Sequence, residues 1–198
     1  MIKTKEDLKF YLLADKIALK IPNKRKKPRM FLDLIWKYQI ILRKCEYYKN
    51  TNKKILYKIN KFRLNILGDK LTIKFEPNTF GPGLSIAHIG TIVVNPSAKV
   101  GKNCRIHEGV TIGATNGKSE SPIIGDNCFI GSGAKIIGNI HIGNNVAIGA
   151  GAVVVNDILE NNITVGGVPA KKISDNSSKS NIIDAVSIAK GELKDGID

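Results

Sequence analysis

A large aliphatic residue returns at every sixth position through the middle of this chain, and this period constrains the fold more than any other feature. A helix would repeat its apolar positions every three or four residues, and a half-buried strand every two. A period of six predicts short strands separated by tight turns. The repeated residues are Val94, Val100, Ile106, Ile112, Ile124, Ile130, Ile136, Ile142, Ile148 and Val154.

Three six-residue faces make one coil of about 18 residues, and successive coils stack at the strand spacing of about 4.8 Å. The predicted fold class is therefore mainly β, a parallel β-helix with a triangular cross-section preceded by a small helical region. We expect three parts: a basic α-helical region over 1–70, the β-helix over 71–173 and a polar tail over 174–198.

The first 70 residues carry helical patterns. Thr4 and Asp7 have the spacing of a capping box in front of a helix over about 5–20. A second helix is predicted over 31–48, where apolar residues recur at three- and four-residue steps.

A third helix is predicted from the spacing of four apolar residues, with lysines around them. Aromatic side chains among lysines also fit RNA binding, but helical spacing favours the core of a small bundle. We therefore expect these four to be buried and expect no nucleic-acid partner. The four residues are Ile55, Ile59, Phe62 and Ile66.

The charge is distributed unevenly. The chain has 198 residues and a net charge of +14, yet residues 1–75 hold 21 basic and 6 acidic side chains while residues 76–198 hold 10 and 11. A basic region of this kind attracts anions such as a membrane surface, and the equally weighted alternative is a solvated lysine-rich surface. The start of the chain lacks the apolar run of a signal peptide, and no stretch is long enough to span a bilayer. We expect a cytoplasmic protein, with contact to the inner face of the membrane through the basic region as one of these two alternatives.

Three cysteines, Cys45, Cys104 and Cys128, are odd in number and widely spaced. Two of them occupy a small inward position of the repeat. They are typical of reduced core residues and not of a disulfide or metal framework.

The repeat is interrupted where chemistry is expected. Counting back in sixes from Val94 places His88 where an aliphatic residue should stand, and spacing alone leaves it either a core histidine or a positioned base. His107 follows 19 residues later, one coil plus one, so the two can lie on adjacent coils. With Glu108 it either orients a catalytic group or is an exposed polar residue, and both remain open. His141 fits a solvent-facing edge.

These residues resemble the hexapeptide acyltransferases, and within them the serine acetyltransferase branch. The resemblance covers about 77–173 and is carried by Gly-Leu-Ser-Ile-Ala-His-Ile-Gly over 83–90, by the repeats over 124–155 and by Gly-Gly-Val-Pro-Ala-Lys over 166–171. It implies a left-handed β-helix, a homotrimer, acetyl-CoA bound between neighbouring subunits and no metal. It also implies that His88 is the general base, since an imidazole with a pKa of about 6.5 can deprotonate a hydroxyl that attacks the thioester.

By the same resemblance, cofactor contacts are expected along the repeat and at its end. The expected residues are Gly113, Ala114, Thr115, Ser132, Gly133, Ala150, Gly151, Lys171 and Lys172.

Two departures from the serine-specific pattern bear on the acceptor. Ser121 stands where those enzymes carry a second histidine before a proline, and Lys74 stands near their lead-in aspartate, with Glu76 on the same face as a candidate substitute. These departures favour a sugar hydroxyl in bacterial surface polysaccharide biosynthesis as acceptor, with serine O-acetylation in cysteine biosynthesis as the alternative. A non-catalytic or metal-binding solenoid is a further alternative, but the three histidines lack the spacing of a metal site.

Overall fold

A computed structural model describes residues 1–115 and 120–194 of the chain. Within these residues, three helices precede the strands and one follows them. They are α1 (Lys5–Ala18), α2 (Leu34–Asn50), α3 (Lys54–Leu71) and α4 (Ala185–Lys194). The predicted capping box is confirmed, because the Thr4 side chain accepts from the backbone N–H of Asp7 at 3.0 Å and the Asp7 carboxylate accepts from that of Thr4 at 2.9 Å. The second helix begins at Leu34, later than predicted.

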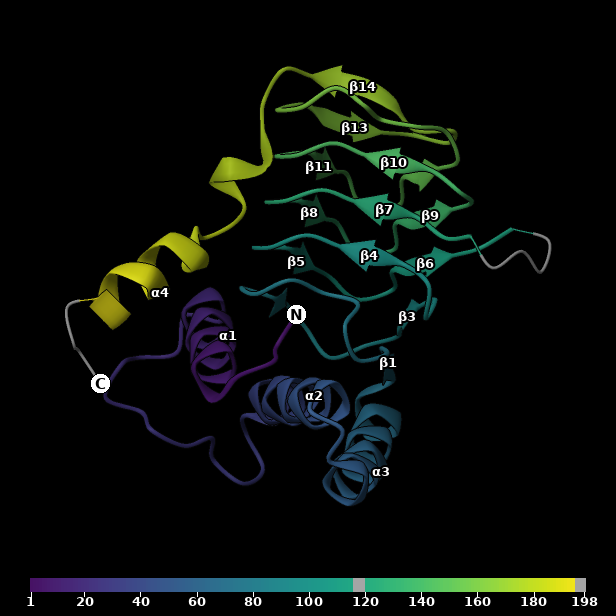
Figure 1. Cartoon of the computed structure of the whole chain (residues 1–198). Helices are drawn as coiled ribbons and strands as arrows, with labels where there is room; N and C mark the ends of the chain where they lie inside the picture. The colour runs from purple at the N-terminus through teal and green to yellow at the C-terminus, as the bar shows by residue number, and fades with distance from the viewer. Residues whose placement is uncertain (116–119, 195–198) are drawn as a thin grey trace.

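The strands form three parallel sheets that wrap around one axis, stacked above the helices in Figure 1. Among the strands of the described residues, only β13 and β14 pair antiparallel, at the end of the stack. Sheet A contains β1 (Ile73–Lys74), β3 (Ile92–Val94), β6 (Thr111–Gly113), β9 (Lys135–Ile137) and β12 (Val153–Val154). Sheet B contains β4 (Lys99–Val100), β7 (Ile123–Ile124) and β10 (His141–Ile142). Sheet C contains β2 (Ser85–Ile86), β5 (Arg105–Ile106), β8 (Phe129–Ile130), β11 (Ala147–Ile148), β13 (Thr164–Gly166) and β14 (Lys171–Ser174).

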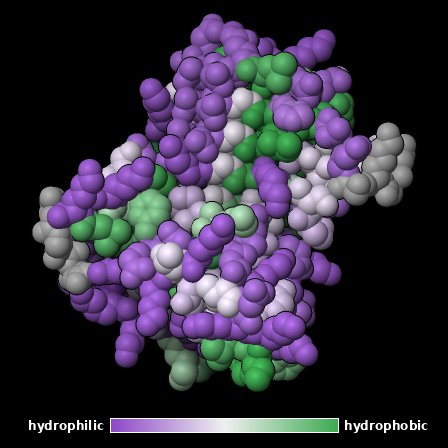
Figure 2. Space-filling model, viewed as in Figure 1, coloured by the Kyte–Doolittle hydropathy of each residue, from purple (hydrophilic) through white to green (hydrophobic). Residues whose placement is uncertain are grey.

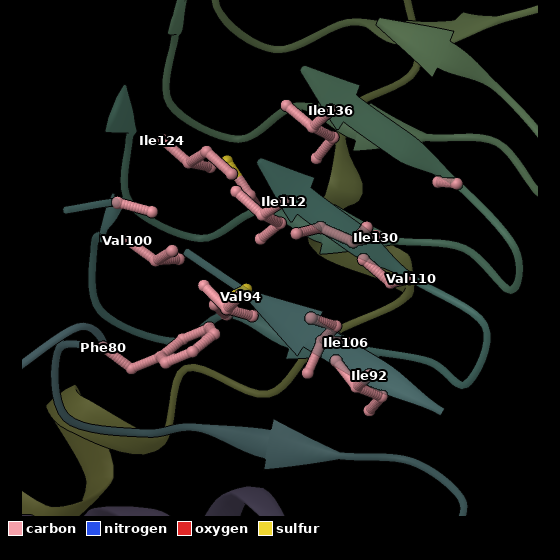
Figure 3. Packing of buried hydrophobic residues seen from close by; sticks show 14 of the residues in the cluster. Phe80, Ile92, Val94, Val100, Ile106, Val110, Ile112, Ile124, Ile130 and Ile136 are labelled. Carbon is pink, nitrogen blue, oxygen red and sulfur yellow. The ribbon is translucent and has the colours of Figure 1, made fainter. Parts of the chain in front are cut away.

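The six-residue repeat supplies the core of the β-helix. Every residue that the period selects from Val94 to Val154 is at most 5% exposed, and Figure 3 shows several of these side chains pointing toward one another from the three sheets. The three cysteines are buried and free, as predicted. Aliphatic side chains on opposed strands interdigitate here, so the spacing of the repeat specifies the cross-section.

The first coil differs from the prediction in its register. Ile86 pairs with Ile106, and Phe80 forms a bridge with Val100, so these two residues occupy the inward positions that counting by six gave to His88 and Pro82. Ile86 and its partner Ile106 are 20 residues apart in the sequence, whereas Ile130 and its partner Ile148 are 18 residues apart, so the first coil is two residues longer. The two additional residues place His88 in an exposed turn after β2, outside the core.

A buried arginine joins the helices to the β-helix. Arg43 of α2 is 0% exposed and forms ion pairs with Asp15 of α1 at 2.8 Å and with Glu46 at 3.0 Å. Its guanidinium also donates to the backbone carbonyls of Phe80 and Gly81, at 2.8 and 2.6 Å. Because every charge in this group is paired and hydrogen-bonded, it can be retained away from water.

The prediction that the apolar face of α3 is buried is wrong. Ile55, Ile59, Phe62 and Ile66 are 76, 50, 67 and 56% exposed, and Figure 2 shows apolar surface at the bottom of the view, over α3. The helix instead buries its opposite side. A Cβ on Gly68 would lie 2.6 Å from the carbonyl oxygen of Ile73, so this close approach to β1 fixes which face turns inward.

The tail is more ordered than a polar extension. The short 3-10 helix Ser178–Ser180 lies along the turns between sheets B and C, where the backbone N–H of Ser178 donates to the carbonyl of Asn145 at 3.1 Å. Farther on, α4 packs its buried Ala185, Val186 and Ala189 against α1, beside it in Figure 1. The tail therefore joins the end of the β-helix to the first helix. Among the residues that the structure describes, no helix has the length and apolar character needed to cross a membrane.

Candidate functional site

The polar residues of interest gather at one edge of the β-helix. We call the turns that join sheet C to sheet A, over 87–91, 107–110, 131–134 and 149–152, the histidine corner. Backbone hydrogen bonds hold these turns in register: Gly109 N–H donates to the carbonyl of Thr91 at 2.7 Å, and Gly133 N–H to that of Glu108 at 2.8 Å. A Cβ on Gly90 would lie 2.7 Å from the Cβ of Glu108, so only glycine lets the first turn lie this close to the second.

His88 and His107 lie together at this corner. Their ring centroids are 5.4 Å apart at an interplanar angle of 65°, as the spacing of one coil plus one predicts. The His107 ring also lies against Phe129, with centroids 5.1 Å apart. His88 is exposed whereas His107 is half-buried. The outer imidazole is thus accessible to a substrate, and the inner one is fixed by packing.

Glu108 completes the cluster. One carboxylate oxygen lies 3.9 Å from Nδ1 of His107, too far for a hydrogen bond, and it has no other partner among the described residues. A hydrogen bond from the Ser132 side chain is the main cause that lowers the pKa of Glu108, so the group is a carboxylate near neutral pH. Such loose pairs are common at catalytic sites without substrate, because they tighten only in the reactive complex.

Burial lowers the pKa of His107, and the positive charge of Arg105 lowers it further. Its Nε2 is buried and has no hydrogen-bond partner in the described part of the chain. A neutral imidazole with an unoccupied nitrogen can accept or relay a proton. The cluster therefore has the composition of a proton-transfer site.

The expected cofactor residues fall into separate groups. Ser132, Gly133, Ala150 and Gly151 continue the histidine corner, where Gly151 N–H donates to the Ser132 carbonyl at 2.8 Å. Gly113, Ala114 and Thr115 lie at the opposite edge of sheet A, where β6 ends. Within one chain, the structure brings only the first group together with the histidines.

The remaining expected cofactor residues belong to β14. Lys171 pairs with Gly166, and Lys172 forms ion pairs with Glu160 at 2.5 Å and Asp175 at 2.6 Å. Because two carboxylates already engage Lys172, Lys171 is the more available cation at the end of the stack.

The two positions at which the sequence departs from the serine-specific pattern lie away from the histidine corner. Glu76 forms an ion pair with Lys61 of α3 at 2.7 Å, so it is not part of the cluster. Ser121 precedes β7 of sheet B, away from the histidine corner, and it is buried with no hydrogen-bond partner for its Oγ among the described residues. Most of the polar loop before it, over 116–119, lies outside the described residues.

Sequence reasoning missed two neighbours of His107. Phe129 and Arg105 are register partners on the outer face of sheet C, so they line the approach to the ring. The sequence did contain one signal: Arg105 precedes His107 by two residues, and alternate residues of a strand share a face.

Two imidazoles and a carboxylate are also a donor set for a divalent cation. One donor atom from each of His88, His107 and Glu108 lies within 4.8 Å of the others. A tetrahedral zinc site holds its donors closer, at roughly 3.3 Å from one another given metal–ligand distances near 2.0–2.1 Å. The 3.9 Å between Nδ1 of His107 and the Glu108 carboxylate exceeds this separation, so these two groups are not arranged as ligands of a tetrahedral zinc ion.

The repeats match a known family. The sequence model of the family described as bacterial transferase hexapeptide (six repeats) matches residues 121–156. A solved structure of the Neisseria gonorrhoeae serine acetyltransferase in complex with serine is 31% identical, covering 85% of this chain and 70% of that one with a TM-score of 0.64. The chain belongs to the hexapeptide-repeat acyltransferases. The expected left-handed β-helix is thereby confirmed.

Two further relatives of this chain are also named serine acetyltransferase. The serine acetyltransferase of Staphylococcus xylosus is 38% identical over 96 residues, 44% of each chain. That of Brucella abortus, solved in complex with coenzyme A, is 28% identical with a TM-score of 0.66, over 86% of this chain and 67% of that one. The chain spans less than half the length of the curated relatives it matches.

These comparisons overturn the prediction of a sugar acceptor in polysaccharide biosynthesis. The matched relatives are serine acetyltransferases, and one was solved with serine bound. The prediction rested on Ser121 in place of a histidine and Lys74 in place of an aspartate, but changes at two positions do not define a new acceptor class.

Proposed function

We propose that the chain is an acetyl-CoA-dependent serine O-acetyltransferase. The observation that carries this proposal is the cluster of His88, His107 and Glu108 at the histidine corner, adjoining Ser132 and Gly133 on the next coil. Relatives solved with coenzyme A and with serine support both substrates.

The chemistry follows from the exposed imidazole. A hydroxyl is a weak nucleophile at neutral pH, so His88 removes its proton as the oxygen attacks the thioester carbonyl. The tetrahedral intermediate collapses with loss of the coenzyme A thiolate, which takes the proton back from the imidazolium. The His107 ring lies beside the His88 ring and positions it, while the Glu108 carboxylate lies 3.9 Å from Nδ1 of His107. No step requires a metal ion.

We further propose that the active unit is a homotrimer. Large apolar side chains remain exposed along the β-helix, and one of them, Ile89, is next to the general base. The others are Val93, Ile123, Val155, Leu159, Val168 and Ile173. A neighbouring copy would cover them and bring its Gly113–Thr115 edge toward the histidine corner, which unites the two groups of expected cofactor residues.

A direct assay tests the enzymatic proposal. Purified protein is mixed with acetyl-CoA and L-serine, and the free thiol released is followed together with O-acetylserine by mass spectrometry. Thiol release that depends on L-serine supports the proposal. Release that is no faster than in buffer would reject it. Sedimentation of the same sample measures the trimer.

A second role is favoured by the exposed face of α3. We propose that this face holds the protein at an anionic membrane surface on the cytoplasmic side. Phe62 and Ile66 stand out from a helix that also carries the exposed Lys54 and Lys58, the arrangement of an interfacial amphipathic helix. A groove of about 830 Å³ adjoins it, lined by apolar residues that include Trp36 and by several lysines. Basic residues near anionic lipid each contribute roughly 1 kcal/mol of attraction.

A further inference from the structure

A groove opens among the first three helices and the loop that joins α1 to α2. It measures about 830 Å³, and every residue that lines it falls within 12–67, so it is separate from the histidine corner. Leu13 of α1, Ile40 of α2 and Leu67 of α3 are among its apolar walls. Trp36 lines it too, although only 5% of this residue is exposed. The groove therefore reaches below the helix surfaces to a buried indole, and its volume is that of a small-molecule site.

The groove is positively charged. Its lining residues include no acidic side chain and six basic ones, which are Lys16, Lys26, Lys27, Lys37, Lys44 and Arg63. Lys37, Lys44 and Arg63 form no ion pair with a carboxylate within 1–115 and 120–194. The ammonium of Lys37 donates instead to the carbonyl of Met30 at 2.7 Å, which holds the loop against α2. A lining of this composition attracts an anion.

Asp33 and Glu192 are carboxylates near the groove, but neither lines it. Asp33, at the end of the loop, pairs with two arginines of the same loop. Glu192 of α4 faces Lys16, yet burial and the positive charge of Lys26 together lower the pKa of Lys16. Like charges are thus crowded in the groove, and a bound phosphate would relieve their repulsion.

The groove is continuous with the exposed apolar face of α3. Ile66 lies on that face, where it is 56% exposed, and it also lines the groove. An acyl chain can therefore pass from a bilayer under α3 into the groove without crossing water. A partner helix, about 10–12 Å across with its side chains, would cover the opening without reaching Trp36. A lipid chain fits these observations better than an acidic peptide.

We propose that the groove binds one acyl chain of an anionic phospholipid and that its basic side chains hold the headgroup phosphate. The apolar walls remove the methylene groups from water, and the cations supply charge-assisted hydrogen bonds to the phosphate oxygens. The proposal rests on the membrane role proposed for α3 and names the molecule recognised there, a single lipid with a phosphate headgroup. Adsorption to a charged surface alone needs no groove.

Trp36 reports on the groove directly, because it is the only tryptophan of the chain. The probe is lysophosphatidic acid with a brominated acyl chain, used below the concentration at which it forms micelles, since bromine quenches an indole only at short range. We expect saturable quenching of the Trp36 fluorescence. Lysophosphatidylcholine with the same chain, whose headgroup has no net charge, should need at least about a tenfold higher concentration. Glycerol 3-phosphate, which lacks the chain, should not displace the probe at equal concentration.

Two substitutions reverse a positive charge of the groove on different helices. Lys44→Glu in α2 and Arg63→Glu in α3 should each weaken binding of the probe about tenfold. Lys49→Glu reverses an exposed charge of α2 outside the groove, so it is the matched control and should bind the probe as the wild type does. Circular dichroism of each variant verifies that the helices remain folded.

The outcomes separate the groove from the membrane role. Phe62 lies outside the groove, so Phe62→Glu should bind the probe as the wild type does even where it no longer floats with vesicles. Wild-type fluorescence that the probe does not quench would overturn the proposal, and flotation with anionic vesicles would then leave the membrane role intact. Equal quenching by the two brominated lipids, or full displacement by glycerol 3-phosphate, would also overturn it. Quenching without flotation would support the groove and reject the role of the exposed face alone.

Discussion

His88 and His107 come from successive coils, yet their rings lie 5.4 Å apart because the first coil is two residues longer than the regular ones. The longer turn carries His88 out of the core and over the next turn. Ile86 takes the inward position instead. The histidine pair is therefore produced by an irregularity of the repeat.

Replacing His88 by alanine should lower kcat by a factor of about 10²–10⁴, the usual contribution of a general base. The KM for acetyl-CoA should be unaffected, because the exposed ring is not part of the core. Steady-state kinetics with L-serine measure both values. His141→Asn is the matched control, since His141 is exposed at another edge. A His88→Ala variant with full turnover would show that the base lies elsewhere.

The sequence predicts the core of the β-helix better than its irregular parts. A fixed period identifies the inward residues from Val94 to Val154, because each coil repeats the same contacts. Counting by six cannot detect two additional residues in one turn, so it misplaced His88. The apolar stripe of α3 indicated a helix, but the close approach of Gly68 to Ile73 decides which side is buried. The repeat pattern of a sequence does not show which residues of neighbouring elements come this close together.

The pKa of His107 should lie below the ordinary imidazole value of 6.5, because burial lowers it and the positive charge of Arg105 lowers it further. NMR of the imidazole protons across pH measures this, and Arg105→Gln should move the midpoint upward. The folded state disfavours the protonated ring, so the unfolded chain binds more protons below about pH 6.5. The free energy of unfolding should therefore fall as pH drops through this range. A midpoint above 6.5 in the wild type would contradict the assignment.

Removal of metal ions should leave the activity unchanged. Nδ1 of His107 and the Glu108 carboxylate are 3.9 Å apart, farther than two ligands of a tetrahedral zinc ion, and the proposed reaction needs no Lewis acid. Dialysis against a chelator followed by the thiol assay measures this, with elemental analysis of the same sample. Stoichiometric zinc, together with activity that zinc restores after chelation, would replace the general-base mechanism by a metal-assisted one.

Arg43→Ala should lower the free energy of unfolding by about 3–5 kcal/mol, since it leaves the buried carboxylates of Asp15 and Glu46 without their partner. Denaturant unfolding followed by circular dichroism measures the change. Lys49→Ala removes an exposed charge from the same helix and should change stability little. Equal stabilities for the two variants would show that the arginine does not fasten the helices to the β-helix.

Phe62→Glu should weaken binding to anionic vesicles about tenfold, because it places a negative charge in the middle of the exposed apolar face of α3. Flotation with phosphatidylcholine vesicles, with and without phosphatidylserine, measures this at low and high salt. Ile188→Glu makes the same kind of change on α4, where the side chain is also exposed, and should bind as the wild type does. Wild-type protein that fails to float with phosphatidylserine at low salt would reject the membrane role. A Phe62→Glu variant that sediments as a smaller oligomer would instead assign this face to a second copy of the chain.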